Sequence, residues 1–190
     1  DPNRAPTFAP GALELPQGDP VLLSGAAAEQ FDRAYLAYFE IQRAMADDQM
    51  PPPAAWNLLL ESLTQLEALG AVPDEVQRQA ATARRAAERM GGSLENARSA
   101  FRSVSHAMLR AAVVARGPQT AQALTHYYCP MVPGHGGDWM QPGGDLLNPY
   151  WGSEMLTCGE VVRDLSLRSP VPTPDPDAID EPAPLEEPGP

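Results

Sequence analysis

The sequence predicts a mainly α-helical protein, an antiparallel four-helix bundle followed by a C-terminal irregular module rich in Gly, Pro and aromatic residues. Apolar residues recur at three- and four-residue spacing through four segments, which is the period of an amphipathic helix. The segments are joined by short loops, which favour antiparallel neighbours. Residues 126–159 then lose this period and gather Gly, Pro and aromatic residues.

The first helix is expected over about 26–47. Its apolar face is formed by Phe31, Tyr35, Tyr38, Ile41 or Gln42, and Met45. The prolines that follow Met50 end it, because proline lacks a backbone N–H and clashes with the preceding turn. A second, leucine-rich helix is expected from about Trp56 to Leu69, and Gly70 suits its C-terminal cap.

The third helix is expected from Pro73 to about Met90. Pro73 suits a first helical position, and Asp74 and Glu75 complement the helix dipole in the first turn. Its narrow apolar stripe consists of Val76, Ala80, Ala83 and Ala87.

The fourth helix follows two glycines and is capped by Ser93, whose hydroxyl is suited to bind a free backbone N–H. Its core positions are Ala97, Phe101, Val104, Met108 and Ala112. His106 is off this stripe, so we expect it to face solvent.

Three regions are expected along the chain. Residues 1–24 form a Pro-rich arm, and residues 25–163 hold the helical bundle and the C-terminal module. Residues 164–190 are rich in Pro, Asp and Glu and poor in apolar side chains, so we expect a disordered acidic tail.

The charge excludes several classes of partner. The net charge of the 190 residues is −12, which is unsuited to nucleic acids and to anionic membrane surfaces. No run of about 18 apolar residues is present, so no membrane span is expected. The chain begins at Asp1 and not at Met, so we expect a processed or trimmed protein, from which a secretion signal or lipid anchor could have been removed.

The two cysteines both lie in the C-terminal module, and each has a methionine nearby. The pairs are Cys129 with Met131 and Met155 with Cys158. Thiolates and thioethers are soft donors that select copper(I) over magnesium or calcium. His126 and His135 lie close in sequence and are candidates for an imidazole ligand.

The same cysteines allow other roles. A disulfide would close a loop of about 29 residues and stabilise the fold by roughly 3 kcal/mol. A zinc site with histidines is a further alternative, although no CxxC or HxxxH pair is present. Methionines also fill core gaps more often than they bind metals.

Patterns of common enzymes are missing. Gly134–Gly137 lacks the Lys and Ser/Thr of a phosphate loop, and no Gly-x-Ser-x-Gly elbow occurs. A catalytic Cys129 with His126 is non-specific. Asp138 and Asp145 stand beside glycines and are expected to be turn residues. No catalysis is expected.

Four sequence runs of the C-terminal module resemble a known family when taken together. They are Cys129-Pro130-Met131, Gly137-Asp138-Trp139-Met140-Gln141, Asn148-Pro149-Tyr150-Trp151-Gly152 and Met155-Leu156-Thr157-Cys158-Gly159. The chain resembles, over about residues 25–163, a small domain of formerly unknown function found in secreted bacterial proteins. The same domain occurs at the C-terminus of CusB-like periplasmic adaptors of copper and silver efflux pumps.

The resemblance implies a periplasmic or otherwise extracytoplasmic protein that handles copper(I), with silver and zinc as alternatives. It makes the C-terminal module a metal-binding module with Cys129, Met131, Met155 and Cys158 as ligands. It also suggests an efflux-pump or envelope copper protein as partner. Where that family has a histidine directly before the Cys-Pro-Met run, this chain has Tyr128.

Overall fold

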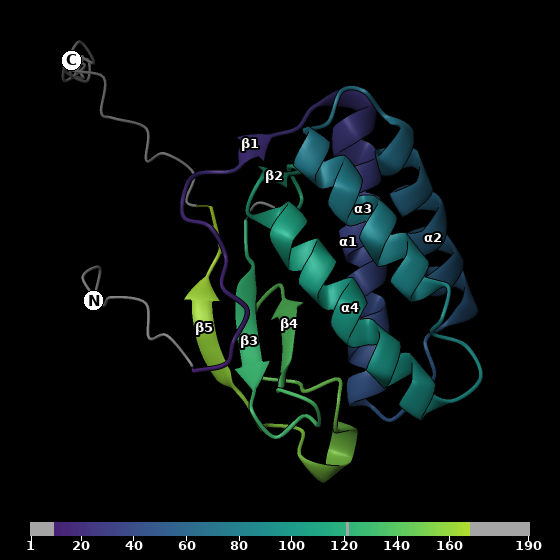
Figure 1. The fold of residues 1–190 in the computed structure, drawn as a ribbon, viewed down its shortest axis with the longest axis vertical. Helices are drawn as coiled ribbons and strands as arrows, with labels where there is room; N and C mark the ends of the chain where they lie inside the picture. Colours follow the sequence, from purple (N-terminus) through teal and green to yellow (C-terminus); the bar gives the residue numbers. More distant parts are fainter. Residues whose placement is uncertain (1–9, 121, 168–190) are drawn as a thin grey trace, which may run out of the picture.

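The computed structural model describes residues 10–120 and 122–167, and within them the chain is mainly helical, as predicted (Figure 1). Its α-helices are α1 (Gly25–Ala46), α2 (Pro53–Ala68), α3 (Asp74–Ala87) and α4 (Leu94–Ala112). No helix in these residues has both the length and the apolar character needed to cross a bilayer.

The predicted helix faces are buried. Every apolar position named above for α1, α3 and α4 lies in the core. The predicted cap of α4 is present, since Ser93 Oγ accepts a hydrogen bond of 3.2 Å from the Asn96 backbone N–H. α3 ends earlier than expected, at Ala87, because the amide of Met90 turns back onto the Ala87 carbonyl.

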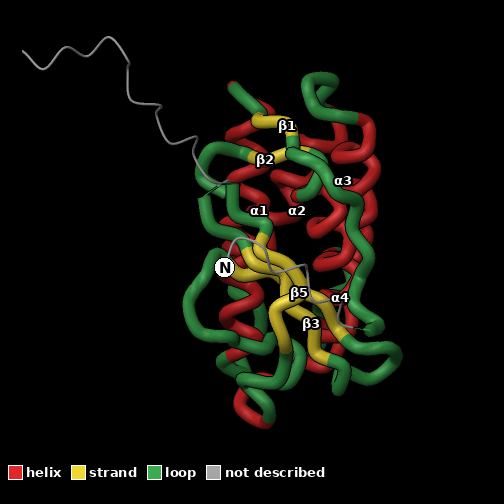
Figure 2. Tube along the Cα trace, turned by 90° about the vertical axis from the view of Figure 1, so that its left-hand side faces the viewer, coloured by secondary structure: helices red, strands yellow, loops and turns green. Residues whose placement is uncertain are grey.

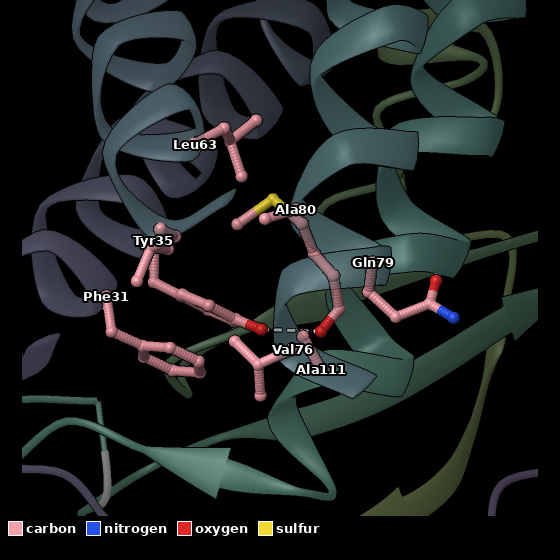
Figure 3. A pocket seen from close by; sticks show the side chains of 9 residues that line it. Phe31, Tyr35, Leu63, Val76, Gln79, Ala80 and Ala111 are labelled. Atoms are coloured by element: carbon pink, nitrogen blue, oxygen red, sulfur yellow. Dashed lines mark hydrogen bonds between the residues drawn. The ribbon is translucent and has the colours of Figure 1, made fainter. Parts of the chain in front are cut away.

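Helices that follow one another in the chain pack side by side: α1 with α2, α2 with α3, and α3 with α4 (Figure 1). The core also joins α1 to α4 through Tyr35, whose hydroxyl donates a 2.5 Å hydrogen bond to the Met108 carbonyl (Figure 3). Tyr35 stacks on Phe31 with ring centroids 4.4 Å apart. Burial raises the pKa of Tyr35, so its hydroxyl stays a neutral donor.

The segment after the helices is more regular than expected. It contains an antiparallel sheet of β3 (Thr125–Cys129), β4 (Gly137–Gln141) and β5 (Glu160–Asp164), in the order β4-β3-β5. A short 3-10 helix, η1 (Gly152–Glu154), lies between β4 and β5 in the chain. Figures 1 and 2 place the sheet on one side of the helices, with β5 outermost.

The edge of β4 that faces the helices is closed by tyrosine hydroxyls. The backbone N–H of Met140 donates to the Tyr38 hydroxyl at 3.1 Å, and the Tyr150 hydroxyl donates to the Asp138 carbonyl at 2.5 Å. Tyr38 of α1 also hydrogen-bonds Ser105 Oγ of α4 at 2.7 Å. An unpaired backbone group at a buried edge is costly, and the Tyr38 hydroxyl, which satisfies one such group, attaches the sheet to α1.

The described part of the arm, residues 10–24, lies against the folded core. β1 (Val21–Leu22) pairs in parallel with β2 (Ala115–Arg116), which follows α4. Arg163 of β5 donates to the Pro16 carbonyl at 3.0 Å, and the arm runs beside the sheet in Figure 1. The tail is predicted from residue 164, but Asp164 is the last residue of β5 and Leu165 is buried. The predicted arm before residue 10 and the remainder of the predicted tail, from residue 168, lie outside the described residues.

Replacing Tyr38 by Phe is expected to lower the free energy of unfolding by about 1–3 kcal/mol, because the Met140 amide loses its acceptor in a buried site. Chemical denaturation measures the change. Tyr127→Phe is the matched control, since the Tyr127 ring stacks on Trp139 and no hydrogen bond is found for its hydroxyl in the described part of the chain. Equal losses in the two variants would contradict the role of the Tyr38 hydroxyl.

Candidate functional site

The structure brings Cys129 and Cys158 together. Cys129 is the last residue of β3 and is fully buried, whereas Cys158 lies two residues before β5 and is partly exposed. Their Sγ atoms are 2.9 Å apart, and both are free thiols. Two sulfur donors from segments 29 residues apart in the chain therefore meet at one point.

The pairing of β3 with β5 brings the chain segments of Cys129 and Cys158 side by side, and a tight turn before β5 brings the two side chains together. The Cys158 backbone N–H donates to the Met155 carbonyl at 3.0 Å, which turns the chain toward β3. Gly159 then passes directly over Trp139, where a Cβ atom would lie 2.7 Å from the indole ring. A glycine is needed at this position, because a side chain would push the turn away from the sheet.

Asn148 holds the turn from the other side. Its buried side chain donates from Nδ2 to the Cys158 carbonyl at 2.7 Å, and its Oδ1 accepts from the Tyr150 N–H at 2.8 Å. Its own backbone N–H donates to the Leu156 carbonyl at 2.8 Å. The sequence motif contained Asn148, but its role in positioning Cys158 was not predicted.

The electrostatic surroundings keep the Cys158 thiol protonated in the absence of a cation. Burial raises the pKa of Cys158, and the adjacent Cys129 raises it further, to about 11. A positive charge beside Cys158 would favour its thiolate form. A bound metal ion supplies such a charge.

The two predicted thioether ligands flank the cysteines in the chain. Met131 lies in the loop after β3, and 58% of its surface is exposed. Met155 begins the turn that carries Cys158 and is partly buried. An exposed methionine on a loop is free to change rotamer, so Met131 can adapt to a bound ion at little cost.

The predicted histidine ligands do not join the cysteines. His135 is exposed in the loop between β3 and β4, where its backbone has a φ of 89°. His126 is fully buried in β3. Side chains alternate along a strand, so His126 and Tyr128 share one face of the sheet and Cys129 shares the other with Tyr127.

His126 instead takes part in a cluster around Asp138 that the sequence did not predict. The Asp138 carboxylate accepts from His126 Nε2 at 2.7 Å, from His106 Nε2 of α4 at 3.1 Å and from the Leu13 backbone N–H at 2.9 Å. The expectation that Asp138 is a turn residue is wrong, because it lies in β4 and is 2% exposed. His106 is only partly exposed and points to Asp138 rather than to solvent alone.

These contacts set the charge of Asp138. Burial alone would raise its pKa, but the hydrogen bonds from His106, His126 and Leu13 outweigh burial and lower the pKa to about 2. We assign the His126 proton to Nε2, which donates to Asp138. This tautomer leaves only a lone pair on the buried Nδ1, which has no partner.

The donor set limits what a metal ion would find here. In the described ranges, no group of three or more His, Cys, Asp or Glu side chains is placed to hold a metal. An ion at the cysteine pair would therefore be bound by two thiolates, with thioethers or solvent completing its shell. The tetrahedral set of four Cys, His or carboxylate ligands typical of structural zinc is not formed by these residues.

Comparisons of the chain with protein-family profiles, curated proteins and solved structures found no match. The family resemblance suggested by the motifs of the C-terminal module stays a prediction.

Asp138 is expected to make the stability of the fold depend on pH between about 4 and 2. Its folded pKa of about 2 lies below the ordinary value of 3.8, so its ionised form stabilises the folded state above pH 4. This contribution, on the order of 2 kcal/mol, is lost as the pH falls toward 2. Urea unfolding at a series of pH values measures it.

Asp138→Asn removes the titrating group and should flatten this part of the pH profile. Asp145→Asn is the control, since Asp145 is exposed and, among the residues that the structure describes, accepts a hydrogen bond through its backbone carbonyl alone. The assignment fails if Asp138→Asn retains the steep acid dependence of the parent.

Proposed function

We propose that this protein binds copper(I) in an extracytoplasmic compartment and takes part in copper handling or resistance, without catalysis. The observation that supports this proposal is the meeting of the Cys129 and Cys158 thiols, 2.9 Å apart, from two distant segments. Periplasmic location and an efflux-pump or envelope copper protein as partner follow from the motif resemblance and belong to the same proposal.

The donor types favour a soft monovalent ion. Thiolate and thioether ligands select copper(I), and silver(I) shares this preference. Two thiolates suit an ion of low coordination number, with Met131 and Met155 as additional donors. Zinc is the weaker alternative, because His126 is bound to Asp138 and lies on the other face of the sheet.

The remaining fold serves as a scaffold under this proposal. The four helices, which we take to form the antiparallel four-helix bundle, support the metal-binding module through the contact of Tyr38 with β4. Trp139 stacks on Tyr127 with centroids 5.4 Å apart and lies under Gly159.

A structural disulfide is the second candidate, and the same sulfur geometry favours it. In that case Cys129 and Cys158 are a covalent link in an interaction module of an envelope or efflux assembly. The two candidates differ in the thiol content of the native protein. Two thiols per chain in protein purified anaerobically without reductant would exclude the disulfide. A count of zero thiols would exclude a copper(I) site formed by reduced cysteines in the native protein.

The reduced protein is expected to bind one copper(I) per chain in competition with a chromophoric chelator under anaerobic conditions. Cys129→Ser and Cys158→Ser should each abolish this competition, because one thiolate cannot hold the ion alone. Met131→Leu and Met155→Leu should weaken binding by a smaller factor, since a thioether is a neutral and weaker donor.

Met50→Leu is the control for nonspecific thioether effects, because Met50 is 41% exposed and precedes α2, outside the C-terminal module. Unchanged copper(I) affinity in the two serine variants would refute the proposed site. An equal loss in Met50→Leu and Met131→Leu would remove Met131 from the ligand set.

Asn148→Asp is expected to weaken copper(I) binding by roughly tenfold without removing a sulfur, in the range seen for outer-shell changes. The carboxylate keeps the acceptor for Tyr150 N but loses the donor to the Cys158 carbonyl. Asn96→Asp, in the first turn of α4, is the matched control. Chelator competition measures both, and equal affinities for the two variants would show that Asn148 does not position Cys158.

A further inference from the structure

A groove of about 560 Å³ lies between the first half of α4 and the loops of the sheet. α4 contributes Leu94, Glu95, Arg98, Ser99 and Arg102; the loop after β3 contributes Val132 and Pro133; and the segment around η1 contributes Tyr150, Trp151 and Glu154. The start of α4 and η1 both lie at the lower end of the molecule in Figure 1. Glu95, Ser99 and Glu154 are exposed, so the groove opens to solvent and is accessible to another molecule.

Two carboxylates of the groove have no counter-ion. Glu95 lies in the first turn of α4, and Glu154 is the last residue of η1. Neither forms an ion pair with any residue that the structure describes. Both charges are therefore available to a molecule that enters the groove.

The two arginines of the groove do not neutralise these carboxylates. Arg98 is paired with Asp48 at 2.7 Å, so this pair adds no net charge. Arg102 donates to two backbone carbonyls of the loop after β3 and lies about two helical turns from Glu95, or about 10 Å along the axis. Two unpaired negative charges then stand against one positive charge, and the groove attracts a cation.

The remaining walls of the groove are mainly apolar. Leu94, Val132 and Pro133 supply aliphatic surface, and Tyr150 and Trp151 supply aromatic rings. Apolar surface next to unpaired carboxylates suits a chain segment in which a basic side chain stands between apolar ones. The net charge of −12 over the whole chain also favours a basic partner over an acidic one.

We propose that the groove docks a segment of a partner protein that carries one arginine or lysine between apolar side chains. The cation of this segment is bound by Glu95 and Glu154, and its apolar side chains pack on Leu94, Val132 and Trp151. The proposal does not rest on the proposed copper(I) site, because no cysteine or methionine lines the groove.

Two peptides that differ in charge test the groove. The ¹⁵N-labelled full chain is titrated with N-acetyl-leucyl-arginyl-leucinamide and, separately, with the same peptide in which citrulline, a neutral isostere, replaces arginine. The backbone amide signals of Ser99, Val132 and Trp151 should shift saturably, and the affinity for the arginine peptide should be about fivefold higher. The signals of α2, which does not line the groove, should stay in place.

Variants of the carboxylates locate the site at which the charge is recognised. In the double variant Glu95→Gln/Glu154→Gln the two peptides should bind equally, whereas Glu61→Gln, which alters an exposed residue of α2, should keep the fivefold difference. Equal affinities in the parent would overturn the proposal, as would a difference that survives in the double variant, or no binding of either peptide. Groove signals that shift with protein concentration alone would assign the groove to a second copy of the chain and also overturn it.

Discussion

The carboxylate of Asp138 lies almost wholly out of water, and a buried charge costs several kcal/mol unless polar donors surround it. The protein meets this demand with donors from three separate places: Leu13 of the arm, His106 of α4 and His126 of β3. The arm, a helix and the sheet must therefore take up their relative positions for this one charge to be tolerated.

The positions of the cysteines depend on the same residue through a continuous path of hydrogen bonds. The Asp138 carbonyl accepts from the Tyr150 hydroxyl, the Tyr150 N–H donates to Asn148 Oδ1, and Asn148 Nδ2 donates to the Cys158 carbonyl. Cys129 ends the strand that pairs with Asp138 through Tyr128. The positions of the two thiols are thus set by contacts of backbone, amide and hydroxyl groups.

The helices were predictable because their signals are local: an apolar period, a capping serine at Ser93 and glycines between segments. The sheet was not, because its strands are five residues long and β3 and β4 are buried on both faces, which hides the alternation of a half-exposed strand. Asp138 was misassigned because glycines precede it. The sulfur pair was predicted from spacing and motif. His126 was expected beside it because it is close in sequence, and its place on the opposite face of the sheet follows only from the strand β3, which was not predicted.

The separation of the two thiols along the chain has a consequence for the order of events after synthesis. In an unfolded chain the sulfurs are 29 residues apart, and bringing them together costs loop-closure entropy. The pair exists as a unit only after β3 and β5 have joined, so folding precedes any capture by the pair. An ion bound by both sulfurs favours the native state, in which they already lie together, and by mass action it shifts the folding equilibrium toward that state.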